Sequence, residues 1–497
     1  MTNWQRDQGM LTDKRMERLI KLTYKLSMEE FVHRADLAGE LNCSLRTVDA
    51  TLNELQVEIE KGSTSMKIDF VNGQTMQLTG KDDAFLKRLL HHFYLQDDMI
   101  RFFLVAISKK ISAKTFVDEQ YMSRATFFRK LKQLNQWLAK YELAFNLRTL
   151  ELQGDERHIR QFYFTTLLEI TGKITWPFPF DREKIEHRLD AIVRGLSLQL
   201  SSTQKEAYLY LLAVQHYRTE QNHFSPEYDQ AFPFTIRERL IGCCQSFLES
   251  FPAEYRKGEE DFLLMVVVNS PCLYHPSWIL EENIQTHMDR KTHAWFITEK
   301  FTKALSSLFP DALNEGNLIH IKGHLLQLHC NYHYHSASYL SYKDLIYAKA
   351  IKKQHPLLMS IVDKLAKATT HTNVKTLSTI KTRYLLMLYT FIDINTFQPP
   401  MRLLILSSEG PVYEDTLSEK ILGYVPFQLE ISTSAIEHKK PKDRRPYSLI
   451  LTDMPMVAHS NDNILYVHSP PTFHDWSRIY ERCVSAYWNQ PDYASFG

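Results

Sequence analysis

Two stretches of this chain align with each other without gaps. Residues 37–55 read LAGELNCSLRTVDATLNEL, and residues 116–134, which begin 79 positions later, read FVDEQYMSRATFFRKLKQL. Apolar residues match apolar residues, and Ser44 of the first copy matches Ser123 of the second. Each copy predicts a short helix, a break and a second helix, because Ser is a preferred N-cap residue and the apolar residues after it recur at helical spacing. The repeat therefore predicts two helix-turn-helix motifs.

A β-hairpin is expected after each copy. Residues 66–80, MKIDFVNGQTMQLTG, alternate about an Asn-Gly pair, which is the strongest short-range hairpin signal. Residues 142–156, ELAFNLRTLELQGDE, also alternate and close with the same Leu-x-Gly pattern. A single motif of this kind is explained equally well by an ordinary helical hairpin. Two copies in register, each followed by a hairpin, indicate two winged helices.

The second helix of each motif begins with small, polar and basic side chains. In a helix-turn-helix protein this helix enters the major groove of duplex DNA, where its first turn faces the base edges. The helix N-terminus also favours phosphate. We therefore predict that the DNA-binding residues are Ser44, Arg46, Thr47, Ser123, Arg124, Thr126, Arg129, Lys130 and Lys132.

Local charge distinguishes the two copies, although the whole chain has a net charge of only +1. Residues 101–140 contain nine Lys or Arg and two acidic residues, a balance of +7. Residues 34–61 contain three Arg or Lys and six acidic residues, a balance of −3. Because neutralisation of phosphates dominates affinity for DNA, the second copy is expected to contribute most of the binding.

Length and composition favour a mainly helical protein of several domains. At about 150 residues per domain, 497 residues correspond to three or four domains. Glycine is scarce at 15 residues, which disfavours glycine-rich phosphate loops, and the six cysteines form no C-x-x-C pair, which favours reduced thiols. No apolar run approaches the about 18 residues that span a bilayer. We expect a cytoplasmic protein without a membrane partner.

The middle and the end of the chain differ in their pattern. Residues 176–397 are helical in blocks that suggest two consecutive bundles dividing near residue 290; the blocks are 182–200, 203–221, 235–250, 260–269, 293–308, 317–336, 343–365 and 375–394. The last hundred residues contain short apolar runs rich in β-formers, namely 401–408, 427–432, 447–453 and 463–469. Helical stretches alternate with these runs, which predicts a small α/β domain with a mostly parallel sheet.

Histidines are dense in the two bundles, and three interpretations of them compete. The pairs His320/His324 and His329/His333 have the i,i+4 spacing of metal ligands, but no H-E-x-x-H motif and no carboxylate at a matching offset accompanies them. Most of these histidines individually suit a surface or a hydrogen-bonded core. The third interpretation is phosphorylation, which would add about two negative charges near a bundle interface. The candidates for phosphorylation are His216 and His324.

The order of the predicted domains resembles that of the Mga/AtxA group of Gram-positive virulence regulators, which contain helical bundles that are phosphorylated on histidine. The predicted domains are two winged helices at 1–81 and 82–175, two bundles similar to phosphotransferase-regulated domains (PRDs) at 176–290 and 291–398, and a domain at 399–497 similar to the IIB component of sugar phosphotransferase systems. The resemblance implies that the winged helices read double-stranded promoter DNA. It also implies that the phosphotransferase histidine carrier protein is the phosphodonor and that the α/β domain supports a homodimer.

The bundle motifs match the PRD pattern only loosely, so the resemblance adds reserve phosphorylation candidates: His223, His275, His329 and His371. In the α/β domain the phosphoacceptor cysteine of the IIB pattern is missing from the first β–α loop, SSEGPVYED at 407–415. This domain is therefore not expected to carry phosphate.

Two other functions stay open. One is a DNA-binding regulator whose histidines are inert, and the other is an RNA-binding antiterminator with PRDs. Antiterminators of that type begin with a small β-rich domain, whereas this chain begins with helix-turn-helix motifs that suit duplex DNA. An enzyme is disfavoured, because the sequence contains no nucleophile with a base and an orienting group, no P-loop and no zinc-hydrolase spacing. No metal or cofactor is expected.

Overall fold

The computed structural model covers most of the chain. It describes residues 10–63, 65–108, 112–172, 174–229, 232–269, 277–308, 315–335, 344, 347–349, 351–352, 356–369, 377–391, 400–425, 427–434, 447–455 and 463–488. The chain divides into two compact units. The first comprises Met1–Thr302, Leu318–Tyr347 and His371–Thr382, and the second comprises Lys303–Asn317, Ala348–Thr370 and Arg383–Gly497. Each unit is described by itself.

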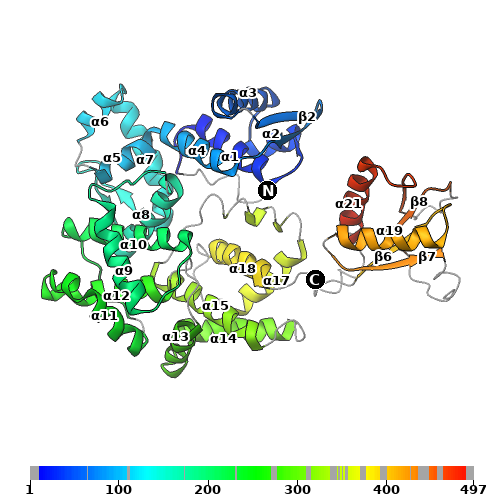
Figure 1. The fold of residues 1–497 in the computed structure, drawn as a ribbon. Helices are drawn as coiled ribbons and strands as arrows, with labels where there is room; N and C mark the ends of the chain where they lie inside the picture. The colour runs from blue at the N-terminus through cyan, green and yellow to red at the C-terminus, as the bar shows by residue number, and fades with distance from the viewer. Residues whose placement is uncertain are drawn as a thin grey trace. The chain divides into compact units, whose positions relative to one another are not determined.

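The first winged helix lies at the start of the first unit (Figure 1). Its elements are α1 (Lys14–Met28), β1 (Val32–His33), α2 (Arg34–Leu41), α3 (Leu45–Gly62), β2 (Lys67–Asn72) and β3 (Thr75–Thr79). The strands form an antiparallel sheet in the order β1-β3-β2, so the expected hairpin is present. Leu37, Val48, Leu52 and Leu55, the apolar positions of the repeat, are all buried in its core. The helix α4 (Asp83–Gln96) belongs to the same core and lies beyond the predicted boundary at residue 81.

The second winged helix repeats this arrangement with an aromatic core. Its elements are α5 (Asp98–Ser108), α6 (Ala113–Glu119), α7 (Arg124–Leu138), β4 (Ala144–Phe145), β5 (Leu152–Gln153) and α8 (Glu156–Thr171). The Phe102 ring meets Phe116, Phe127 and Phe145 edge-on, with centroids 5.3 to 5.4 Å apart. The second wing is an antiparallel pair of two-residue strands, much shorter than the alternating sequence suggests.

A helical bundle follows, and its core is continuous with that of the second winged helix. Its helices are α9 (Arg182–Gly195), α10 (Ser202–Glu220), α11 (Phe234–Glu249), α12 (Ala253–Asn269) and α13 (Ser277–Asp289). The predicted helical blocks match α9 to α12 but omit α13. The omission has a physical reason, because Asn283 and His287 are polar residues on the buried face of α13 and break its apolar periodicity.

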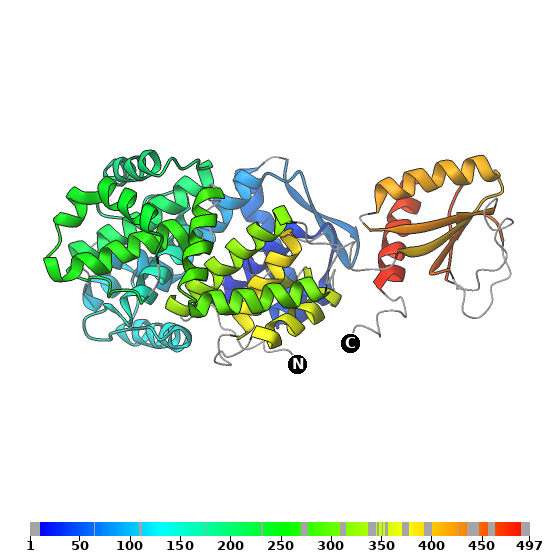
Figure 2. The same cartoon turned by 90° about the horizontal axis from the view of Figure 1, so that it is seen from below.

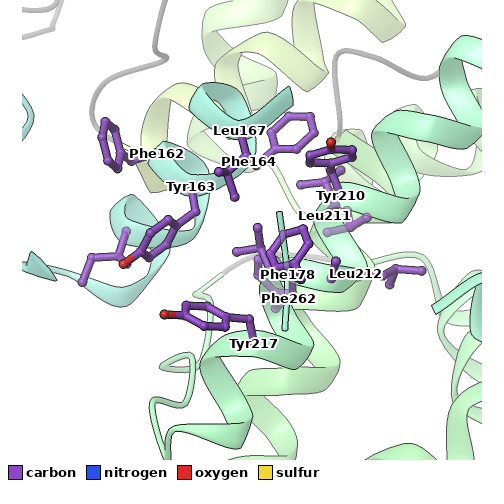
Figure 3. Close-up of a cluster of buried hydrophobic side chains, with 14 of the residues drawn as sticks. Phe162, Tyr163, Phe164, Leu167, Phe178, Tyr210, Leu211, Leu212, Tyr217 and Phe262 are labelled. Carbon is purple, nitrogen blue, oxygen red and sulfur yellow. The ribbon is translucent and has the colours of Figure 1, made fainter. Parts of the chain in front are cut away.

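The centre of this core joins α8 to α10 and α12 (Figure 3). Tyr163 of α8 and Tyr217 of α10 meet edge-on, with ring centroids 5.9 Å apart. The helix α10 is buried over nearly its whole length and around its whole circumference, from Glu206 to Thr219. A helix that is surrounded on all sides is the central element of a bundle.

The later helices complete the helical part of the chain. They are α14 (His293–Leu308), α15 (Glu315–His335), α17 (Pro356–Thr369) and α18 (Leu377–Phe391). Within the predicted block 343–365, the described residues 344, 347–349 and 351–352 are helical, and α17 begins at Pro356. Proline is favoured in the first turn of a helix and cannot continue one from before. No helix in the described ranges is long and apolar enough to cross a membrane.

The C-terminal residues form the predicted α/β domain, which is part of the second unit (Figure 2). Its elements are β6 (Met401–Leu406), α19 (Pro411–Tyr424), β7 (Leu429–Thr433), β8 (Leu449–Thr452), β9 (Ile464–Tyr466) and α21 (Phe473–Trp488). All strand pairs are parallel, in the order β7-β6-β8-β9, which confirms the parallel sheet. Alternate residues of β6, Met401, Leu403 and Ile405, share one core with α19 and α21.

A buried ion-pair network connects α8 to α10 and α12. The guanidinium of Arg160 donates to both carboxylate oxygens of Glu259, at 2.7 and 2.9 Å, and to Glu156 at 3.0 Å. Glu259 also accepts from the side chain of Gln215 at 2.8 Å and from the backbone N–H of Ser225 at 2.7 Å. The Arg160 and Glu259 side chains are 1% and 0% exposed, so each charge depends on the other.

We expect Glu259→Ala to destabilise the first unit by about 3–5 kcal/mol, because it leaves the Arg160 guanidinium buried without its main partner. Urea unfolding of the full chain measures the loss, and native-state hydrogen exchange of α8 and α10 locates it. Glu254→Ala, on an exposed residue of the same helix, is the control and should cost about 0.5 kcal/mol or less. Equal unfolding midpoints for the two variants would contradict this assignment.

Candidate nucleic-acid interface

The second helix of each motif begins at the predicted serine. The Ser44 hydroxyl accepts the backbone N–H of Thr47 at 3.2 Å, and the Ser123 hydroxyl accepts that of Thr126 at 3.0 Å. In both motifs the serine and threonine hydroxyl oxygens also lie 2.9 Å apart. With these caps, the polar side chains at the start of α3 and α7 face solvent. A recognition helix requires this, because its first turn faces the base edges.

Most of the predicted DNA-binding side chains reach solvent. Those that are exposed are Ser44, Arg46, Ser123, Arg124, Arg129 and Lys132. Thr47 and Thr126 are half-buried, and each donates its backbone N–H to the capping serine. Lys130 differs from its neighbours, because its Nζ atom donates to Asp98 of α5 at 2.5 Å and its side chain is 18% exposed. Its charge is therefore largely neutralised within the protein.

The first winged helix neutralises more of its positive charge than the second. Arg34 is paired with Asp49, which lies in the first turns of the recognition helix α3. Arg15 of α1 is paired with Glu54 of the same helix. Arg46 remains exposed and has no acidic partner among the described residues. The sequence predicts that the second winged helix is more positively charged than the first. These ion pairs increase that difference, because they neutralise basic residues of the first winged helix.

Sequence reasoning missed one basic residue of this surface. Arg148 is exposed in the turn between β4 and β5, which is the tip of the second wing. The Asn146 side chain fixes this turn by accepting the N–H groups of Arg148 and Thr149 at 2.8 and 3.1 Å. An Asn followed by a basic residue inside an alternating segment was the available signal.

The candidate phosphorylation sites have different environments. His216 of α10 is buried, with the Phe180 ring 4.7 Å from its own, and burial together with Arg188 and Lys184 lowers its pKa to about 4. Its Nε2 atom lies 3.0 Å from Glu220 but makes no hydrogen bond in the described structure. His223 is half-buried beside α10, and burial and Arg218 lower its pKa. The imidazoles of His216 and His223 are therefore both mainly neutral at pH 7.

Two further candidates lie on α15. His324 is half-buried, and burial together with His320 lowers its pKa. His329 is fully buried, which lowers its pKa to about 3, and its Nδ1 atom lies 2.7 Å from the Thr298 hydroxyl. Because that hydroxyl donates to the Ala294 carbonyl, Nδ1 of His329 is the donor in this contact. His275 and His371 lie outside the described residues.

The first loop of the α/β domain is occupied by carboxylates of the same domain. The backbone N–H of Ser407 donates to the buried Glu414 at 2.9 Å, and that of Ser408 donates to Asp453 at 2.8 Å. The Ser407 hydroxyl also donates to Asp453, at 2.6 Å. These contacts engage the amides that a β–α loop of this type offers to an anion.

Two capped recognition helices, each followed by an antiparallel wing, define the class of winged helix-turn-helix proteins. Residues 82–167 match the Mga helix-turn-helix domain. The chain is also 20% identical over 491 residues to a protein of Streptococcus pneumoniae serotype 4 named "Putative trans-acting regulator", a similarity that covers 92% of this chain and 95% of the relative. Together these similarities support a DNA-binding transcription regulator of the Mga-like family.

The buried histidines predict how stability depends on pH. The pKa values of His216, His287 and His329 fall to about 4, 4 and 3 in the folded protein, below the about 6.5 of an unfolded chain. Below pH 6.5 the unfolded state therefore binds more protons, and we expect the free energy of unfolding to fall from pH 6.5 toward pH 4.

His329→Asn removes one of these groups and should make the decline shallower by up to about 1.4 kcal/mol per pH unit, the value of one proton. Urea unfolding midpoints between pH 4.5 and 8 measure the slope. His474→Asn, at an exposed position, is the control and should retain the wild-type slope. A wild-type stability that stays constant over this range would contradict the prediction.

Proposed function

We propose that this protein is a transcription regulator that binds promoter DNA chiefly through its second winged helix. The observation that supports this division most strongly is the state of the basic side chains. Arg124, Arg129 and Lys132 are exposed along α7, with Arg148 at the wing tip beyond them. In the first winged helix, Arg46 is the exposed basic residue in the first turn of the recognition helix, and Asp49 follows within one turn. Affinity for phosphate follows the charge that remains free.

The test compares Arg124→Ala/Arg129→Ala with Arg46→Ala on the same promoter fragment. We expect the double variant to lower the slope of log affinity against log salt concentration by about 2, and Arg46→Ala by at most about 1. Lys130→Ala is the matched control on α7: the Asp98 contact already uses its charge, and Arg101 still pairs with Asp98 afterwards. Gel shifts over a salt series measure all four proteins. Equal effects of the double variant and Arg46→Ala would contradict the division of labour.

We also propose that bundle histidines accept a phosphoryl group from the phosphotransferase histidine carrier protein. A neutral imidazole offers a nucleophilic nitrogen at pH 7, and the lowered pKa values of His216 and His324 keep both rings neutral. Arg188 and Lys184 lie near enough to His216 to affect its pKa, and their positive charge would neutralise an added phosphate. His324 is more accessible than His216, since it is half-buried and His216 is buried.

The phosphorylation test incubates the full chain with phosphoenolpyruvate, enzyme I and the histidine carrier protein, followed by mass spectrometry that avoids acid. We expect phosphate on His324 more readily than on His216, because Phe180 must move to expose the latter. His324→Ala and His216→Ala should each remove one modified peptide, and Asp substitutions should change promoter output. His474→Ala is the control. The absence of phosphate from every histidine would leave a DNA-binding regulator with inert histidines.

The α/β domain completes the proposal as the surface through which two chains associate. Its first loop is filled by Glu414 and Asp453, which disfavours binding of phosphate there. A homodimer would present two sets of winged helices to one DNA, and linked modules gain from high effective concentration. The promoter, rather than a sugar or a cofactor, is then the ligand that the assembled regulator recognises.

A further inference from the structure

The turn between the two helices is closed by the same backbone hydrogen bond in both motifs. In the first, the N–H of Cys43 donates to the Ala38 carbonyl at 3.0 Å, and in the second the N–H of Met122 donates to the Val117 carbonyl at the same distance. The residue before each donor has left-handed backbone geometry. It is Asn42, with φ of 49°, in the first motif and Tyr121, with φ of 50°, in the second.

The left-handed conformation is favourable for Asn42 and unfavourable for Tyr121. Asn is among the few non-glycine residues that adopt it readily, and turns of this motif often contain Gly. A bulky side chain with positive φ is a true outlier that persists only when something else maintains it. The Tyr121 side chain is 98% exposed, so packing within the described part of the chain does not compensate for the strain. The Met122 hydrogen bond holds the backbone in this geometry, but no packing contact within the described residues explains the choice of a tyrosine, which points to a partner outside the chain.

The location of Tyr121 identifies that partner under the proposed function, on which this inference rests. Tyr121 precedes the N-cap Ser123 by two residues and the exposed Arg124 by three. When the recognition helix lies in the major groove, the turn before it lies at the groove edge, where the sugar-phosphate backbone runs. Tyrosine hydroxyls commonly donate to phosphate oxygens, and such contacts fix the register of the protein on the duplex.

We propose that Tyr121 is a positioning residue for DNA, whose phenolic O–H donates to a phosphate oxygen at the edge of the groove that α7 enters. The contact is neutral on the protein side. It therefore adds affinity without releasing a further counterion, and it acts alike on every DNA sequence. These two properties distinguish it from the arginines of the same helix.

The test uses the full-length chain with Tyr121→Phe, which removes only the hydroxyl, and Tyr121→Asn, which installs the residue of the first motif. We expect both to weaken binding by about tenfold on a promoter fragment and on an unrelated duplex, with the salt slope unchanged. The melting temperature of Tyr121→Asn should equal or exceed that of wild type, because Asn relieves the backbone strain. Tyr480→Phe, on an exposed tyrosine of the α/β domain, should bind as wild type does.

Wild-type affinity of Tyr121→Phe would overturn the phosphate contact, and so would a loss confined to one DNA sequence, which would indicate a base contact. A lower salt slope in either variant would also overturn it. Arg124→Ala, measured in parallel, separates this inference from the proposed function. If Arg124→Ala weakens binding and Tyr121→Phe does not, only the role of Tyr121 fails; if wild type binds no duplex, the proposed function fails.

Discussion

The Arg160–Glu259 pair is the constraint around which the first unit is organised. A guanidinium that is 1% exposed is tolerated only if its donors are satisfied, and here Glu156, Glu259 and the His223 carbonyl satisfy them. Glu259 in turn holds Gln215 and the Ser225 amide, so the pair ties α8 to α10, α12 and the segment between them. Because α8 is the last helix of the second winged helix, that domain cannot shift against the bundle without exposing two charges. The position of the second winged helix relative to the bundle therefore depends on this pair.

The sequence predicted the winged helices well because their determinants are local. A capping serine, an apolar face and an Asn-Gly turn each act within a few residues, and all of them are found where the repeat places them. What could not be predicted depends on residues far apart. Lys130 meets Asp98 across 32 positions, and Arg160 meets Glu259 across 99. The composition predicts the net charge of each winged helix. Only the fold shows which basic side chains are paired with acidic residues and which are exposed.

The bundles show the same limit in another form. The apolar blocks predicted α9 to α12. They did not predict α13, because buried polar residues interrupt the apolar face of that helix. The histidine interpretations could not be separated by spacing, since burial decides both the protonation state and the accessibility of an imidazole. His216, His324 and His329 all lie in predicted helical blocks, but His216 and His329 are buried, whereas His324 is half-buried. Their lowered pKa values follow from this burial, which no local pattern encodes.

The first β–α loop of the α/β domain is filled by the domain's own carboxylates. The sequence shows that this loop has no cysteine, but it does not show which groups the loop amides contact. Glu414 and Asp453 accept the amides of Ser407 and Ser408, so an incoming phosphate would have to displace two acidic side chains that hold the loop closed. Burial raises the pKa of Asp453, but its hydrogen bonds outweigh this effect and lower the pKa overall. Asp453 is therefore ionised at neutral pH, and its charge repels a further anion.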